Sequence, residues 1–307
     1  MYILGFDIGG TKCAVITALW DGENIKLLKK QKCDTDLTIA PEKMIDRLIL
    51  LAEKILEQKP DAIGISCGGP LDSGKGVIMG PPNLPGWDNV KIVEKLSRHY
   101  GVPAYLQNDA NACAVAEWKF GNGRGYKNLV FLTFGTGLGA GLILNGKLYC
   151  GTNGNAGEVG HIRLAPEGPV GFGKAGSFEG FCSGGGIAQL GRMKFGETTV
   201  HSEITAKSIA EAAMEGDETA LEVYRISGEY LGKGLSVLID ILNPEAIIIG
   251  SIFSRNRELL WEHAKAEIEK EALNVSAECC KVLQAGLGEQ IGDYAAIATA
   301  VWGVEDL

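Results

Sequence analysis

The chain has 307 residues, of which 46% are hydrophobic and 22% are charged, and this balance excludes an intrinsically disordered or collagen-like protein. Its 29 basic and 38 acidic residues give a formal charge of −9, which argues against nucleic acid or an anionic membrane as a main partner. No secretory signal or membrane-spanning run is visible, and eight cysteines are scattered without a C-x-x-C pair, so a reduced, cytoplasmic protein is expected.

The first half of the chain predicts alternating strands and helices. Apolar runs at 3–8 and 13–19 flank a Gly-Gly-Thr-Lys turn, and an Asp-Gly turn precedes a third extended stretch near 25–28. Apolar residues then recur at helical spacing up to residue 56 and are followed by a buried strand at 62–65. A helix near 90–98 and a strand near 102–106 lead to a helix that opens at Gln107-Asn108-Asp109.

The second half repeats this order loosely. A β-prone run at 129–134 leads into a glycine turn, an extended stretch and the Asn145-Gly146 hairpin signal. Residues 151–186 are predicted to be mostly loop, followed by a helix at 218–242, a buried strand at 246–249 and helices at 259–273 and 291–301. The shared order predicts two related lobes of an α/β protein, with a break near 121–125.

Two glycine turns have the features of phosphate-binding segments. In Asp7-Ile8-Gly9-Gly10-Thr11-Lys12, glycines let backbone N–H groups approach phosphate, although a hairpin turn with a solvated lysine is an equal interpretation of this segment alone. A matching turn at 133–137 favours two turns that clamp one polyphosphate. The Walker pattern is absent, and the G-x-G-x-x-A match at 135–140 is followed by extended residues, so an NAD-dependent oxidoreductase is a minor alternative.

The segment Asn108-Asp109-Ala110-Asn111 lies where a strand gives way to a helix. An acid or amide there is a routine N-cap, which stabilises a helix by about 1 kcal/mol. The same carboxylate, on Asp109, is also suited to accept the proton of a sugar hydroxyl during phosphoryl transfer. Three acid or amide side chains in four positions favour this second interpretation.

Glu158, His161 and Glu179 form a polar set within the glycine-rich loop. They suit either a metal or the hydroxyls of a neutral polyol, but too few ligands are present for a closed zinc site. The Pro-Pro-Asn-Leu-Pro-Gly-Trp loop at 81–87 is either a rigid turn or part of a sugar site. The other histidines are expected at the surface: His99, His201 and His263.

Together these motifs resemble the ROK family of sugar kinases, within the actin-like ATPase and hexokinase superfamily. They occur in family order: D-I-G-G-T-K at 7–12, P-N-L-P-G-W at 82–87, N-D-A-N at 108–111, T-F-G-T-G-L-G-A-G at 133–141, G-E-V-G-H at 157–161 and N-P-E-A-I-I-I-G at 243–250. The resemblance implies a two-lobed actin-like ATPase (ribonuclease H-like) fold, with mixed sheets flanked by helices and a cleft between the lobes. It assigns 1–118 and 291–307 to a small N-terminal lobe and 119–290 to a large C-terminal lobe.

The resemblance also assigns roles to individual residues. Asp109 matches the catalytic base. The residues that match sugar-binding positions are Gly69, Asn83, Asn108, Asp109, Glu158, His161 and Glu179. The residues that match nucleotide-binding positions are Asp7, Gly9, Gly10, Thr11, Lys12, Thr133, Gly135, Thr136, Gly137, Gly250 and Ser251. Asp7 is further expected to hold Mg²⁺ through water, and the usual Gly-Gly-Gly at 250–252 is Gly-Ser-Ile here.

One departure concerns zinc. Many relatives bind zinc through the histidine of G-E-V-G-H and a C-x-C-G-x-x-G-C-x-E segment. The three cysteine positions are Val170, Phe172 and Ser177 in this chain, whereas the glycines and Glu179 are retained. We therefore expect no structural zinc, and we expect apolar packing of Val170 and Phe172, with Phe178, to hold the loop.

The resemblance implies an ATP-dependent, magnesium-dependent kinase that phosphorylates a hydroxyl of a hexose or N-acyl amino sugar and forms a homodimer or a higher homo-oligomer. A sugar-sensing regulator is one alternative, but family repressors carry a DNA-binding domain before the first motif, which begins here at residue 7. A catalytically silent sugar-binding protein is another, against which the retention of Asp7, Lys12 and Asp109 argues.

Overall fold

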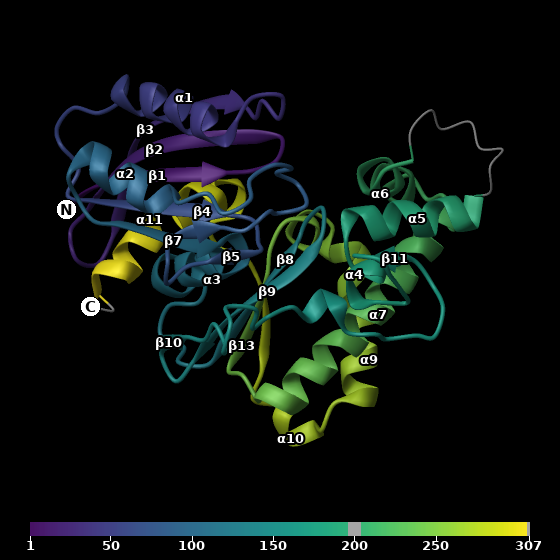
Figure 1. The fold of residues 1–307 in the computed structure, drawn as a ribbon. Coiled ribbons are helices and arrows are strands. Elements are labelled where there is room, and N and C mark those ends of the chain that lie inside the picture. The colour runs from purple at the N-terminus through teal and green to yellow at the C-terminus, as the bar shows by residue number, and fades with distance from the viewer. Residues whose placement is uncertain (196–203, 306–307) are drawn as a thin grey trace. The chain divides into compact units, whose positions relative to one another are not determined.

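The computed structural model describes residues 1–195 and 204–305, which form two compact units (Figure 1). The first unit contains Met1–Gly125, Leu148–Ala156 and the C-terminal segment from Glu289. The second contains Tyr126–Lys147 and Gly157–Gly288. His201 and the last two residues of the predicted small lobe lie outside the described residues.

The first unit is built on a five-stranded mixed sheet in the order β3-β2-β1-β4-β7. Its strands are β1 (Tyr2–Ile8), β2 (Lys12–Trp20), β3 (Ile25–Asp34), β4 (Ala62–Cys67) and β7 (Ala104–Asn108). Strands β1, β2 and β3 are antiparallel neighbours, whereas β1, β4 and β7 run parallel. The carboxyl ends of the three parallel strands therefore meet at one edge, which is the usual ligand edge of an α/β sheet.

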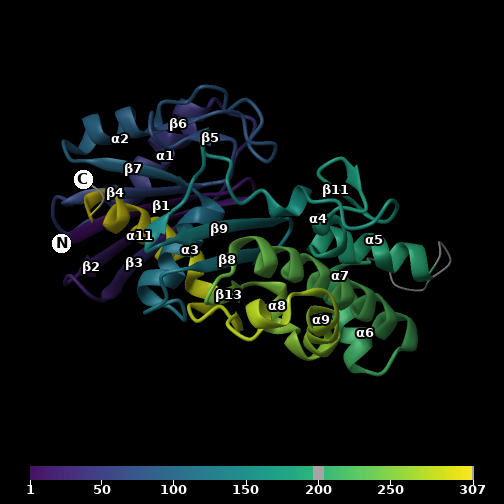
Figure 2. The same cartoon turned by 90° about the horizontal axis from the view of Figure 1, so that it is seen from below.

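Helices cover both faces of this sheet (Figure 2). One face packs against α1 (Pro41–Glu53) and α2 (Ile92–Tyr100) through a fully apolar cluster. The other packs against α11 (Ile291–Glu305), whose small side chains allow close approach, and α11 in turn packs on α3 (Asp109–Phe120). A short hairpin, β5 (Leu71–Asp72) and β6 (Val77–Ile78), follows β4.

The second unit repeats the same topology with the order β10-β9-β8-β13-β14. Its strands are β8 (Leu129–Phe134), β9 (Leu138–Leu144), β10 (Lys147–Leu148), β13 (Ala246–Ile249) and β14 (Lys281–Gln284), and the unit boundary falls within β10, after Lys147. Strand β8 is antiparallel to β9 and parallel to β13, which is parallel to β14. The predicted internal repeat and the mixed α/β fold class are therefore confirmed.

Helices and a small hairpin complete the second unit. They are η1 (Val159–His161), β11 (Val170–Gly171), β12 (Lys174–Ala175), α4 (Phe178–Phe181), α5 (Gly184–Phe195), α6 (Ala206–Met214), α7 (Glu218–Leu242), α8 (Ile252–Arg255), α9 (Arg257–Glu271) and α10 (Asn274–Ala277). The short η2 (Gly288–Gln290) begins at the last residue of this unit and continues into the first. The central helix is α7, which packs against α4, α5, α6 and α9.

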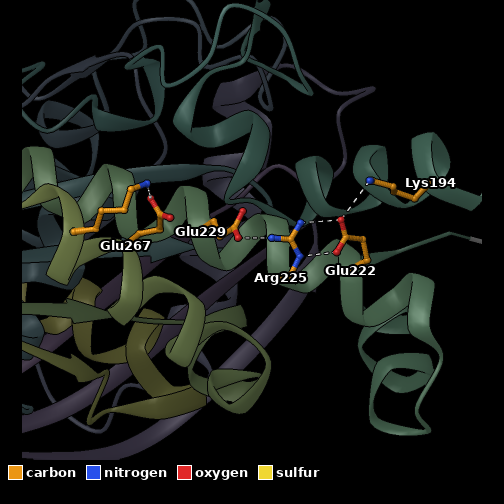
Figure 3. Close-up of polar contacts among 6 residues, drawn as sticks. Lys194, Glu222, Arg225, Glu229 and Glu267 are labelled. Atoms are coloured by element: carbon orange, nitrogen blue, oxygen red, sulfur yellow. Dashed lines mark hydrogen bonds and ion pairs between the residues drawn. The ribbon is translucent and has the colours of Figure 1, made fainter.

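An ion-pair chain links the surfaces of α5 and α7 (Figure 3). Arg225 binds both Glu222, at 2.6 Å, and Glu229, and Lys194 lies 3.5 Å from Glu222. The Arg225 hydrogen bond lowers the pKa of Glu222 to about 2. Because these side chains are substantially solvent-exposed, each pair contributes less than about 1 kcal/mol to folding.

The compact units differ from the predicted lobes in three segments, 119–125, 148–156 and 289–290, and the predicted boundaries at 118/119 and 290/291 stay a prediction. Residues after 118 remain with the first unit because Gly121 and Gly123 donate backbone hydrogen bonds to the Glu117 carbonyl. Leu148–Ala156 also belongs to the first unit, where the Gln107 side chain reaches the Cys150 sulfur at 3.8 Å. Among the described residues, no helix combines the length and hydropathy needed to cross a membrane.

Candidate active site

The first glycine turn joins the carboxyl end of β1 to the start of β2. The Gly9 N–H donates to the Lys12 carbonyl at 3.1 Å, which closes the turn, and the side chains of Thr11 and Lys12 are exposed. A Cβ atom at Gly10 would lie only 2.3 Å from the carbonyl oxygen of Asn83. Glycine is therefore required here so that the turn and the predicted sugar loop can touch.

Other residues at the predicted sugar site of the first unit lie next to this contact. A Cβ atom at Gly68 would lie 3.4 Å from both amide atoms of Asn83, and one at Gly69 would lie 3.1 Å from the Asn108 amide nitrogen. Gly68 and Gly69 follow β4, whereas Asn108 ends β7. Side chains from two neighbouring strand ends and one loop are thus brought next to the glycine turn.

Asp109 is the first residue of α3 and has an exposed carboxylate. The helix is capped by Asn108, whose Oδ1 accepts from the Ala110 N–H at 3.0 Å, and Asp109 Oδ1 accepts from the same N–H at 2.8 Å. The N-cap is therefore Asn108 and not Asp109, a detail that the sequence interpretation had wrong. Buried Gln107 fixes this corner because its Oε1 accepts from the Asn108 N–H and from the Asn111 amide.

Asp7 lies near the end of β1 in an acidic environment. Burial raises the pKa of Asp7 to about 7; Asp293 and Asp109 add to this effect, and Lys30 opposes it. Lys30, on β3, forms an ion pair with Asp293, on α11. Counting Asp7 itself, three carboxylates lie near two lysines, Lys30 and Lys32, so the site keeps a net negative charge. Such a site suits Mg²⁺, which proteins often hold through one carboxylate, waters and substrate phosphates. The residues present therefore fit the expected magnesium.

The raised pKa of Asp7 predicts a pH-dependent stability of the ligand-free protein. Because the folded state holds the Asp7 proton more tightly than the unfolded state, this contribution is largest below about pH 4 and is lost as the pH rises through about 7. Asp7→Asn should raise the free energy of unfolding at pH 8 by on the order of 2 kcal/mol. The gain should shrink toward pH 5 in denaturant titrations; a gain that does not vary with pH would contradict the assignment.

In the second unit, residues 135–137 form the tight turn between β8 and β9. The strand β9 that follows excludes the helix that a dinucleotide fingerprint requires. Thr136 is exposed, but the Thr133 hydroxyl accepts from the Gly139 N–H at 3.0 Å. Thr133 thus closes the strand pair, whereas Thr136 presents its hydroxyl at the surface.

The start of α5 packs against this turn, and the sequence interpretation missed it. The Gly184 N–H donates to the Gly135 carbonyl at 2.8 Å. A Cβ atom added at Gly135 would lie 3.5 Å from Ser251 Oγ. Ser251 has a φ of +55°, a conformation that favours glycine, and it stands at the second position of the Gly-Gly-Gly that the family resemblance leads one to expect at 250–252. The Ser-Gly-Gly-Gly run at 183–186 was the available signal for this helix start.

The polar set predicted in the second unit, Glu158, His161 and Glu179, is also brought together. Glu158 precedes η1, which ends at His161, and Glu179 lies on α4. Burial and then the negative charge of Glu179 raise the pKa of Glu158, whereas His161 lowers it. Glu179 Oε2 also accepts from the Leu138 N–H at 3.0 Å, which fixes its carboxylate beside the β8–β9 turn.

Apolar packing was expected for Val170 and Phe172, which stand at positions matching the family's zinc-binding cysteines, and this prediction is wrong. Val170 is 47% exposed and Phe172 74% exposed, and only Phe178 is fully buried. Hydrogen bonds hold the β11–β12 hairpin instead: Gln189 exchanges two with the Val170 backbone, and the Ser177 hydroxyl donates to the Gly171 carbonyl at 3.4 Å. A hairpin this small has too little interior to cover side chains, whereas its backbone groups still need partners.

Two sheets of matching topology, each with a glycine turn between its first antiparallel strands, define an actin-like ATPase fold. Comparison with known proteins identifies the family within this fold. The ROK family model matches residues 3–301, and the protein belongs to the ROK family.

Individual relatives match most of this chain. The glucokinase of Thermotoga maritima is 34% identical over 273 residues, which is 84% of each protein. A ROK family glucokinase from Streptomyces griseus, solved in complex with glucose and AMPPNP, has a TM-score of 0.79 and 30% identity over 98% of this chain and 99% of that one. The xylose repressor of Caldicellulosiruptor bescii is 30% identical over 88% of this chain and 70% of the repressor.

Proposed function

We propose that this protein is an ATP-dependent sugar kinase that transfers the γ-phosphoryl group of ATP to a hydroxyl of a hexose or N-acyl amino sugar. The observation that carries the proposal is the unbroken series of contacts in the first unit from Gly10 through Asn83 to Gly68, and from Gly69 to Asn108 beside Asp109. The similarity to enzymes named glucokinase supports it.

In this proposal Asp109 is the general base. A sugar hydroxyl is a weak nucleophile. A carboxylate that accepts its proton in the transition state prevents positive charge from developing on the attacking hydroxyl oxygen. The exposed position at the first turn of α3 suits contact with a substrate. Asn108, Asn83 and Gly69 would bind neighbouring hydroxyls, with Glu158, His161 and Glu179 as the sugar-binding set of the second unit.

Each unit carries candidate nucleotide-binding groups. Gly9, Gly10, Thr11 and Lys12 would bind phosphate oxygens in the first unit. The corresponding groups of the second unit are Thr133, Gly135, Thr136, Gly137, Gly250 and Ser251. Mg²⁺ near Asp7 would neutralise phosphate charge when bound. The proposed enzyme uses no zinc, and stoichiometric zinc removable only by strong chelation would contradict this.

The test is a panel of glucose, fructose, allose, N-acetylglucosamine and N-acetylmannosamine with ATP, read by coupled ADP release. ADP release should depend on one or a few of these sugars and on added Mg²⁺. Sugar affinity should be measured in parallel by calorimetry without nucleotide. Sugar binding without sugar-dependent ADP release would contradict the kinase and favour a sugar sensor such as the related repressors.

A further inference from the structure

Thr35 follows the last residue of β3 and contacts the first glycine turn through both its backbone and its side chain. Its hydroxyl donates to the Gly9 carbonyl at 2.6 Å, and its N–H donates to the Thr11 carbonyl at 2.9 Å. Thr35 lies more than twenty positions after this turn and belongs to none of the motifs above. One residue thus binds the carbonyls of two of the turn's residues.

Cys13 completes this arrangement. Its buried sulfur lies 3.3 Å from the Thr35 hydroxyl oxygen and 3.7 Å from the Gly9 carbonyl. Burial raises the pKa of the Cys13 thiol, so it keeps its proton at neutral pH. The Thr35 hydroxyl donates its one proton to the Gly9 carbonyl, and the Cys13 thiol, which also donates toward that carbonyl, packs against the hydroxyl oxygen.

The hydrogen bonds matter because of what a phosphate-binding turn must present. Backbone N–H groups attract phosphate oxygens, whereas carbonyl oxygens in the same turn repel them. Thr35 engages the carbonyls of Gly9 and Thr11, and the Gly9 N–H binds the Lys12 carbonyl at 3.1 Å. The peptide planes of the turn are therefore held with these carbonyls directed at protein donors.

We propose that Thr35 is a positioning residue for the phosphates of the nucleotide: it holds the carbonyls of Gly9 and Thr11 away from the phosphate site. The inference rests on the proposed kinase function and adds a residue to it. Thr35 acts through the turn and does not itself contact nucleotide. Its removal should weaken nucleotide binding while leaving the sugar residues and Asp109 unaffected.

Thr35→Val tests this role because it removes the hydroxyl and keeps the shape and the backbone N–H. Loss of one net hydrogen bond should raise the KM for ATP and the Kd for AMPPNP about fivefold to tenfold. The KM for the sugar and kcat at saturating ATP should change less than about twofold. Thr35→Ser, which restores the hydroxyl, should return the ATP parameters to within about twofold of the wild-type values.

Thr17→Val is the matched control. Thr17 is a fully buried threonine in the neighbouring β2 strand, and its hydroxyl has no hydrogen-bond partner among the described residues. The substitution exchanges the same atoms, but Thr17 pairs with Leu4 in the sheet and makes none of the contacts to the glycine turn, so the KM for ATP should not change. Thermal unfolding of all three variants checks that each is folded under the assay conditions.

An unchanged Kd for AMPPNP in Thr35→Val, or an equal loss of sugar and nucleotide affinity, would overturn the positioning role. Failure of the proposed function is distinguishable, because it would show as a wild-type protein without sugar-dependent ADP release. The AMPPNP titration still decides the role of Thr35 in that case. A wild-type protein that binds no AMPPNP would overturn both proposals.

Discussion

Asp109→Asn is expected to lower kcat for sugar phosphorylation by about 10²–10⁴-fold, the range over which general base catalysis contributes. Asparagine cannot accept the hydroxyl proton, but its side-chain oxygen can still accept from the Ala110 N–H, as Asp109 Oδ1 does at 2.8 Å. Asn108 also remains as the N-cap of α3. The sugar Kd should therefore stay within about threefold of the wild-type value, and the free energy of unfolding should change little.

Asp217→Asn supplies the control for this prediction. Asp217 is an exposed aspartate at the start of α7, and its Oδ1 accepts from the Ala220 N–H at 2.8 Å. The variant makes the same change of charge at a helix N-terminus outside the proposed site, so its kcat should match the wild-type value. Initial rates by coupled ADP release and sugar titrations by calorimetry measure both quantities. Undiminished kcat in Asp109→Asn would refute the general-base assignment.

The sequence predicted those parts of the fold that local patterns control. The helix expected at 218–242 is α7 with the same bounds, and the Asn145-Gly146 turn joins β9 to β10 with positive φ at both residues. Both glycine turns lie between antiparallel strands, as their flanking apolar runs predicted. Each of these features depends on residues within a few positions of one another.

Features that depend on distant residues were not predictable in the same way. Thr35 is an ordinary polar residue after a strand until the structure places it against the Gly9 carbonyl, and Lys30 meets Asp293 across 263 positions. The β11–β12 hairpin was predicted to be loop because its two-residue strands carry no periodic pattern. The cysteine comparison identified the altered positions, but it did not reveal that backbone hydrogen bonds stabilise the hairpin.

Gly64→Ala is expected to have the largest effect on folding. Gly64 lies in the middle of β4, where α11 crosses so closely that a Cβ atom would lie 1.9 Å from the Ala296 carbonyl oxygen and 2.7 Å from the Ala300 nitrogen. Both obstructing atoms belong to helix backbone and cannot rotate away, so β4 and α11 must separate. We expect the free energy of unfolding to fall by about 3 kcal/mol or more.

The same displacement should reach the proposed site, because β4 leads directly to Gly68 and Gly69. Gly74→Ala is the control, since a Cβ atom there would make only an ordinary 3.6 Å contact with Asp72, on an exposed loop. Urea unfolding curves of the two variants and the wild type give the stability differences. If Gly64→Ala were as stable as Gly74→Ala, α11 would not approach β4 this closely. The close backbone packing described for this part of the first unit would then be wrong.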